Sequence, residues 1–155
     1  GFFSDLTAED NLNAIGEILI RDSKSRKLKI EELISKFELD AVRKVEAKFL
    51  SGGMKRRLVI SMSLLGDPEI LLMDEPLAAL DPQTIQMLQN IIIRLQSEYN
   101  LTILITDHQA RDLLVVCDRA VILSNTKIVA EGTPNQLMQN ENATKYYFGS
   151  NFKFK

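Results

Sequence analysis

A serine-glycine stretch about a third of the way along the chain has the residue types that bind phosphate. The stretch is Leu50-Ser51-Gly52-Gly53-Met54, and a basic amphipathic segment follows it directly. Glycines leave the amides of a helix N-terminus bare, and a serine hydroxyl adds a donor, so phosphate oxygens would meet several hydrogen-bond donors and a helix dipole. The alternative interpretation is a glycine-rich helix cap without a ligand.

Two carboxylates and the only histidine each follow an apolar run. Asp74 and Glu75 come directly after residues 70–73, and His108 follows residues 101–105. Because parallel strands of an open α/β sheet place their ligands at their carboxyl ends, we expect these side chains to converge. One carboxylate there can hold hydrated Mg²⁺, and its neighbour can orient or deprotonate a water. Each motif alone is more typical of a solvent-exposed strand end, whereas their convergence favours a site.

The elements that position these motifs fall into two parts. Residues 1–66 are expected to be almost wholly helical: a helix over 8–20 capped by Thr7, a second through 30–37, and a third capped by Ser51 that reaches about Leu65. After Pro68, apolar strands over 70–73, 101–105 and 120–123 alternate with helices over 82–99 and 110–117. We expect residues 70–73 to be buried on both faces of a parallel sheet. A hairpin return at 128–130 and a helix after Thr133 complete an α/β pattern.

Composition bounds the class of protein. With 155 residues, 45% of them hydrophobic, the chain fits one globular domain. A net charge of −2 gives no indication of nucleic-acid binding, and the single cysteine, Cys117, suits a reducing compartment. The apolar runs are too short to span a membrane. Five basic side chains in residues 21–29 are expected to form a solvated loop, with contact to lipid headgroups or a membrane subunit as the alternative.

The order and spacing of these motifs resemble the ATP-binding-cassette (ABC) ATPases. The matching stretches are LSGGM at 50–54, EILLMDEP at 69–76, LAALDP at 77–82 and TDH at 106–108. The resemblance covers essentially the whole chain. It implies an α/β fold of the P-loop NTPase (RecA-like) type, with residues 1–66 as the helical subdomain that ends in the signature helix. Residues 67–155 would then be the C-terminal part of the ATPase core.

The same resemblance implies roles for individual residues, with ATP and Mg²⁺ as ligands. Ser51, Gly52, Gly53 and Met54 match the signature loop, although Met54 replaces the glutamine common in the family. Asp74 would order Mg²⁺ through water, and Glu75 would polarise the attacking water. His108 would contact the γ-phosphate as the switch histidine. Asp81 matches the D-loop, but it is also a good N-cap before Pro82, and both interpretations stay open.

A P-loop, G-x-x-x-x-G-K-[ST], is absent from these 155 residues, because no lysine follows any of the seven glycines. By resemblance, residues 1–12 match the stretch after the Q-loop. We therefore expect the P-loop to lie upstream of Gly1, in a longer subunit of which this is the C-terminal two-thirds, and the chain alone to be inactive. In related cores the strand leading into the P-loop lies between those matching 101–105 and 120–123, so we expect a gap there.

Partners and location also follow from the resemblance. It implies a head-to-tail dimer with a second ATPase subunit, transmembrane permease subunits, no nucleic acid, and a cytoplasmic protein peripheral on the inner membrane. Residues 106–134 and the YYFG at 146–149 resemble the ATPase subunits of lipopolysaccharide exporters, with branched-chain amino-acid importer ATPases as relatives. The alternatives are the ATPase subunit of a branched-chain amino-acid importer and a non-enzymatic interaction fragment. A further alternative is an ABC ATPase of DNA repair or chromosome structure, which would need sustained heptads that are not seen here.

Overall fold

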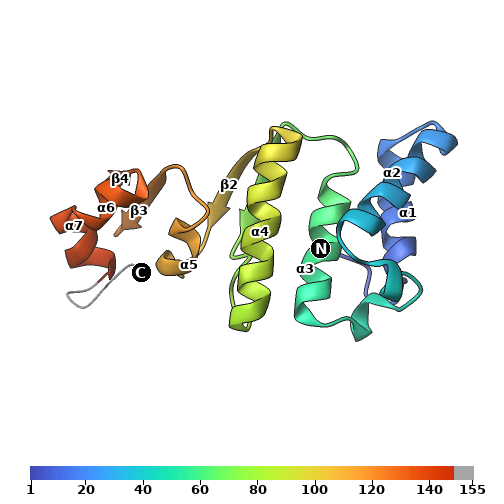
Figure 1. Ribbon diagram of the computed structural model, residues 1–155, viewed down its shortest axis with the longest axis horizontal. Coiled ribbons are helices and arrows are strands. Elements are labelled where there is room, and N and C mark those ends of the chain that lie inside the picture. The colour runs from blue at the N-terminus through green and yellow to red at the C-terminus, as the bar shows by residue number, and fades with distance from the viewer. Residues whose placement is uncertain (149–155) are drawn as a thin grey trace.

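The computed structural model describes residues 1–148 and has three helices at one end (Figure 1). They are α1 (Ala8–Leu19), α2 (Ser23–Lys36) and α3 (Gly52–Ser63), with 3₁₀ turns at Asp40–Val42 and Ala47–Phe49 between α2 and α3. Thr7 caps α1 by accepting a hydrogen bond from the Asp10 amide, as its hydroxyl and the acid three residues on predict. The helical character expected for residues 1–66 is confirmed.

The basic stretch at residues 21–29 is a correction to the expected solvated loop. Helix α2 begins at Ser23, because the Asp22 side chain accepts a hydrogen bond from the Ser25 amide and so caps it. Most of the basic residues therefore lie on helical backbone, and two of them have polar partners within the fold. Arg26 donates to the carbonyl of Ile20, and Lys29 pairs with Asp67 at 2.6 Å.

The strands form two separate pairs. Strands β1 (Ile70–Asp74) and β2 (Thr102–Thr106) are parallel, and the long helix α4 (Pro82–Tyr99) connects them. Strands β3 (Ala120–Ser124) and β4 (Lys127–Gly132) form the expected antiparallel hairpin. The remaining elements are short: α5 (Ala110–Leu114), α6 (Pro134–Met138), α7 (Glu141–Ala143) and a last turn at Thr144–Phe148. The α/β pattern is confirmed, but α5 ends earlier than predicted, and Gly149 lies outside the described residues.

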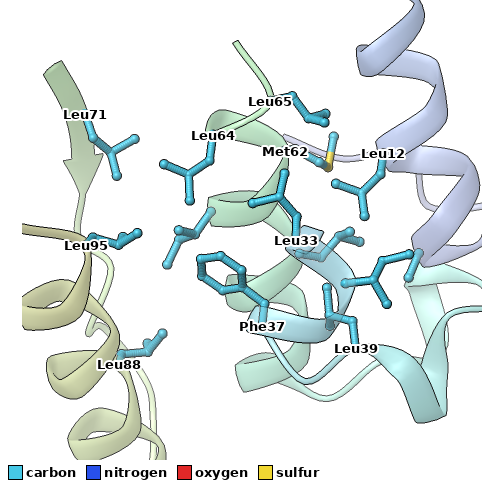
Figure 2. Close-up of a cluster of buried hydrophobic side chains, with 14 of the residues drawn as sticks. Leu12, Leu33, Phe37, Leu39, Met62, Leu64, Leu65, Leu71, Leu88 and Leu95 are labelled. Atoms are coloured by element: carbon cyan, nitrogen blue, oxygen red, sulfur yellow. The ribbon is translucent and has the colours of Figure 1, made fainter. Parts of the chain in front are cut away.

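The main hydrophobic core joins the three N-terminal helices to β1 and α4 (Figure 2). Leu12, Leu33 and Leu88 are fully buried in it. A second, smaller cluster, which includes Leu114 and Leu137, lies under the β3–β4 hairpin. The main core has members on both sides of residue 66, and the division into units at that position stays a prediction. None of the helices described in residues 1–148 combines the length and hydropathy needed to cross a bilayer.

Strand β1 is buried on one face only, so the expectation of burial on both faces is wrong. Leu71 and Met73 point into the main core, whereas Ile70 is 60% exposed and Leu72 is 70% exposed. Leu104 on β2 is 61% exposed. A parallel sheet normally carries helices on both faces. Within residues 1–148, α4 and the N-terminal helices pack on one face of β1. The apolar run in the sequence does not show whether helices also pack on the other face.

Strands β2 and β3 are not paired with each other. The sheet order is β1–β2 in one sheet and β3–β4 in the other. A groove of about 370 Å³ lies between the two, lined by residues that include Ile105, Val121 and Leu123, and it reaches Glu75 and His108. The gap expected between these strands is therefore present in the described part of the chain.

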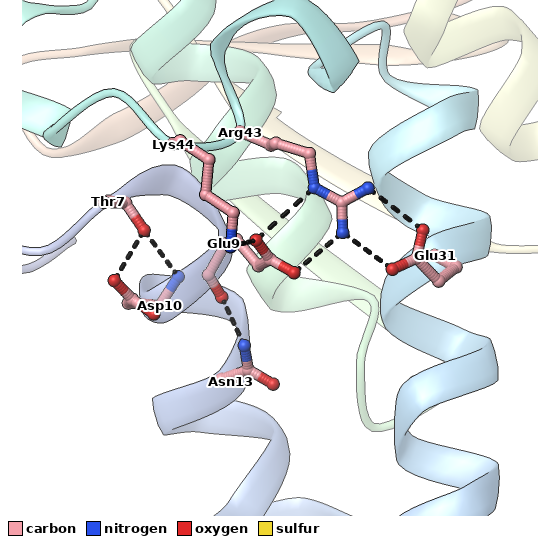
Figure 3. A network of polar contacts seen from close by, with 7 residues as sticks. All are labelled: Thr7, Glu9, Asp10, Asn13, Glu31, Arg43 and Lys44. Carbon is pink, nitrogen blue, oxygen red and sulfur yellow. Dashed lines mark hydrogen bonds and ion pairs between the residues drawn. The ribbon is translucent and has the colours of Figure 1, made fainter.

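A charged network ties the start of α1 to the segment between α2 and α3 (Figure 3). Arg43 lies between two carboxylates, with Nη2 2.7 Å from Glu9 Oε1 and 2.7 Å from Glu31 Oε1. Lys44 also pairs with Glu9. The hydrogen bond from Arg43, followed by that from Lys44, lowers the pKa of Glu9 to about 2. Glu9 is therefore ionised in the fold well below the pH at which an ordinary glutamate is protonated.

Glu9→Gln is expected to lower the free energy of unfolding by about 1 to 3 kcal/mol at neutral pH, since it removes charge-assisted hydrogen bonds to two cations. A depressed folded-state pKa gives stability that is present above the unfolded value of 4.5 and is lost as the pH falls toward about 2. Denaturant unfolding should therefore show the difference between wild type and variant shrinking over that range. Glu17→Gln, at an exposed carboxylate on the same helix, is the control. A difference that is unchanged at pH 3 would contradict this assignment.

Candidate functional site

The signature-like stretch forms the N-terminus of α3. Ser51 is the N-cap, and its hydroxyl accepts a hydrogen bond from the Met54 amide at 3.3 Å. The two glycines differ in what surrounds them. A Cβ on Gly53 would lie 2.9 Å from Thr84 Cγ2, so Gly53 allows α3 to pack against α4. Gly52 is exposed, and a Cβ there would meet only Leu80, at 3.5 Å. Exposed Gly52 thus keeps the helix N-terminus open to a ligand.

The N-terminus of α4 lies beside that of α3 and is capped by Asp81. The Asp81 carboxylate accepts hydrogen bonds from the amides of Gln83 and Thr84 at 3.0 Å each, and from the Thr84 hydroxyl at 2.5 Å. The Thr84 hydroxyl, more than the backbone amides, lowers the pKa of Asp81. Asp81 therefore has a clear structural role, and it also lies next to Gly53 through their common neighbour Thr84.

The carboxyl ends of β1 and β2 bring Glu75 and His108 into contact. Glu75 Oε1 lies 2.7 Å from His108 Nε2. The Thr106 hydroxyl donates to Asp74, the neighbouring carboxylate. The side chain of His108 is 85% exposed and that of Glu75 is 46% exposed, so both can reach a ligand from solvent. The predicted convergence of Asp74, Glu75 and His108 at one sheet edge is confirmed, whereas their chemical roles stay predictions.

Asp107 is a structural residue of this edge that the sequence analysis did not single out. Its carboxylate accepts hydrogen bonds from the Leu77 amide at 3.1 Å and the Gln109 amide at 2.9 Å. Gln109 donates in turn to the Leu77 carbonyl at 3.3 Å. The loop after Glu75 is thus tied to the loop that carries His108. An aspartate between a strand end and a helix start is a usual signal for such a turn.

Tyr147 holds the backbone of the histidine loop from the C-terminal side. Its hydroxyl donates to the carbonyl of His108 at 3.0 Å and lies 3.3 Å from the carbonyl of Asp107. Burial raises the pKa of Tyr147, and Asp107 raises it further, so the hydroxyl stays a donor. No sequence pattern signals this contact, because the partners are 39 residues apart.

The sheet edge suits a magnesium ion better than a closed metal cage. Among residues 1–148, no group of three or more His, Cys, Asp or Glu side chains is placed to hold a metal. Mg²⁺ is usually held by one or two carboxylates, with water and substrate phosphates completing its shell. Exposed Asp74, at the end of β1, fits that requirement.

A larger groove, of about 540 Å³, lies away from this edge. It is formed by residues of α2, α3 and α4, among them Lys36, Arg57 and Arg94. None of the residues expected to carry the chemistry lines it. The smaller groove beside Glu75 and His108 is the one that is relevant to the site.

Comparisons with known proteins show which family this chain resembles. The family model described as ABC transporter matches residues 1–78. The lipopolysaccharide export system ATP-binding protein LptB of Haemophilus influenzae is 40% identical over 153 residues, which is 97% of this chain and 63% of that protein. LptB of Escherichia coli K12 is 37% identical, with the same coverage. The chain thus spans less than two thirds of the length of these relatives.

Solved structures support the fold. CbiO1 of Clostridium perfringens, part of the ABC transporter complex cbiONQ, superposes with a TM-score of 0.81 at 20% identity, over 93% of this chain and 57% of that one. The ADP conformation of MJ1267, an ATP-binding cassette of an ABC transporter, gives 0.78 at 24% identity, over 95% and 64%. At these identities the likeness shows the fold alone. Together with the family match and the LptB relatives, it shows that this chain belongs to the ABC transporter family.

Proposed function

We propose that these residues are part of an ATP-hydrolysing subunit of an ABC transporter that powers lipopolysaccharide export. The observation that carries the proposal is the contact between Glu75 and His108 beside Asp74, at the carboxyl ends of two parallel strands. This is the edge at which open α/β sheets bind their ligands. The lipopolysaccharide export ATP-binding proteins among the relatives support the choice of substrate.

Each residue has a defined role in the proposed reaction. Glu75 polarises the water that attacks the γ-phosphate, and His108, in contact with that carboxylate, binds the γ-phosphate. Asp74 would hold Mg²⁺, and the ion when bound would neutralise charge on the phosphates. Thr106 orients Asp74 by its hydrogen bond.

The P-loop of the proposed site would come from a further strand. The groove separates β2 from β3, which are not paired with each other, and its lining includes Asp74, Glu75 and His108. A strand there, parallel to β2, would deliver the loop at its carboxyl end to these side chains. We therefore propose that a P-loop strand fills the groove in the active subunit, and that the 155 residues alone do not hydrolyse ATP.

The signature stretch is proposed to act on a second subunit. Ser51 and Gly52 are exposed at the N-terminus of α3, where a phosphate could meet the helix dipole. In a head-to-tail dimer this helix would close over ATP held by the partner. Permease subunits in the inner membrane would then use the closure, with this subunit on the cytoplasmic face.

Ser51→Arg tests the proposed function in a fusion protein. This fusion, called the joined protein below, links the chain to the part of the Haemophilus influenzae relative that the chain does not cover. The bulky cation should leave ATP binding to the monomer unchanged but abolish ATP-dependent dimerisation and turnover. Sedimentation with and without ATP, beside a steady-state ATPase assay, measures both. Ser63→Arg, at the exposed far end of α3, is the control and should dimerise normally. A Ser51→Arg protein that dimerises and turns over like wild type would remove the role proposed for Ser51.

A further inference from the structure

The backbone of Glu75 adopts a conformation that needs support from its surroundings. Its φ is +47°, in the left-handed region that residues with a Cβ seldom enter. Such a conformation is strained in residues with a Cβ and persists only where neighbouring contacts fix it. The contacts made by the Glu75 peptide groups therefore decide where its carboxylate points.

Three hydrogen bonds hold these peptide groups. The Glu75 amide donates to the Thr106 carbonyl at 2.7 Å, which continues the β1–β2 ladder. The Glu75 carbonyl accepts one bond from the Ala78 amide at 3.3 Å. It accepts a second from Arg56 Nη2, also at 3.3 Å. The first two bonds come from the sheet and its own turn, whereas the third comes from a different element, α3.

Arg56 and the two cations beside it on α3 donate hydrogen bonds to different segments of the chain. Arg57 Nη1 donates to the carbonyl of Phe37 at 3.3 Å and to Glu38 at 2.8 Å, at the end of α2. Lys55 donates to the carbonyl of Lys48, before the signature stretch. Arg56 is half-buried, and of these three cations it is the one that contacts the Glu75 loop. A charged donor makes this carbonyl contact stronger than a neutral one would.

We infer that Arg56 is a positioning residue that fixes the left-handed backbone of Glu75 and so aims its carboxylate at His108. The inference rests on the proposed function for its catalytic meaning, because Glu75 is the proposed base. Arg56 lies on the helix that Ser51 caps.

The single histidine makes the inference testable in the chain itself, without nucleotide. The ring of His108 gives the only histidine side-chain signals in a ¹H–¹³C NMR spectrum. The Glu75→Gln variant, measured at one fixed pH, gives the chemical shifts of the His108 ring when the partner carboxylate is absent. Arg56→Met keeps a long side chain but removes every donor, and it should displace the ring signals most of the way toward the Glu75→Gln positions.

Lys55→Met is the matched control, because it removes a cation that donates to a carbonyl from the same helix but away from Glu75. Its His108 signals should stay at the wild-type positions. A folded Arg56→Met protein, judged by circular dichroism, with wild-type His108 signals would overturn the inference. If Arg56→Met does not fold, Arg56→Gln replaces it: the shorter, neutral side chain should displace the His108 signals in the same direction, and wild-type signals would again overturn the inference. Neither result depends on ATP binding, so it is distinguishable from a failure of the proposed function.

Discussion

Replacing Glu75 by glutamine is expected to lower ATP turnover by about 10²-fold or more, the usual scale for loss of a positioned general base. The measurement requires the joined protein described above, because we propose that the 155 residues alone are inactive. The amide keeps the size of the side chain but neither polarises nor deprotonates water as a carboxylate does. Binding of ATP should be unchanged, because the proposed phosphate contacts come from His108 and from the P-loop.

Glu69→Gln provides the matched control for this loss. Glu69 is an exposed carboxylate directly before β1, at the opposite end of the strand from Glu75. Its turnover should remain within about twofold of wild type, as for an exposed surface substitution. Steady-state rates at saturating ATP measure turnover, and a separate binding experiment measures nucleotide affinity. If Glu75→Gln lost affinity while turnover per bound ATP stayed the same, Glu75 would belong to binding and not to the chemical step.

The positions of Asp74, Glu75 and His108 could be predicted because they depend on local rules. Each follows a short apolar strand, and parallel strands put their carboxyl ends at one edge, so their convergence could be predicted, whereas the 2.7 Å contact between Glu75 and His108 comes from the structure. Helix caps are equally local. Ser51, Thr7 and Asp81 each bind an amide two or three residues ahead, as their types and positions indicate.

The contacts that hold the site together could not be predicted in the same way. Tyr147 reaches the His108 carbonyl from 39 residues away, and Arg56 reaches the Glu75 carbonyl from 19. Neither residue type is unusual where it stands. The exposure of one face of β1 could not be predicted either, because Ile70 and Leu72 are typical core residue types whether or not a helix covers them. Burial depends on what packs against a strand, and an apolar run does not contain that information.

Hydrogen exchange is expected to alternate residue by residue along β2. The Thr102 amide donates to the Glu69 carbonyl, and the Glu75 amide donates to that of Thr106. Since successive amides of a strand point to opposite sides, the amide of Leu104 faces β1, whereas those of Ile103 and Ile105 face the groove. Amides that face the groove have no strand partner among residues 1–148.

Ile103 and Ile105 should therefore exchange at least about 100-fold faster than Leu104, because unpaired amides need no opening of the ladder before they exchange. NMR-detected exchange in a dilute solution, where the chain is shown to be monomeric by sedimentation, makes the comparison. The joined protein is the control: if a P-loop strand fills the groove, Ile103 and Ile105 should gain protection while Leu104 changes little. Equal and strong protection of all three amides in the monomeric 155-residue chain would show that the groove edge of β2 is already paired. The proposed place of the P-loop strand would then be wrong.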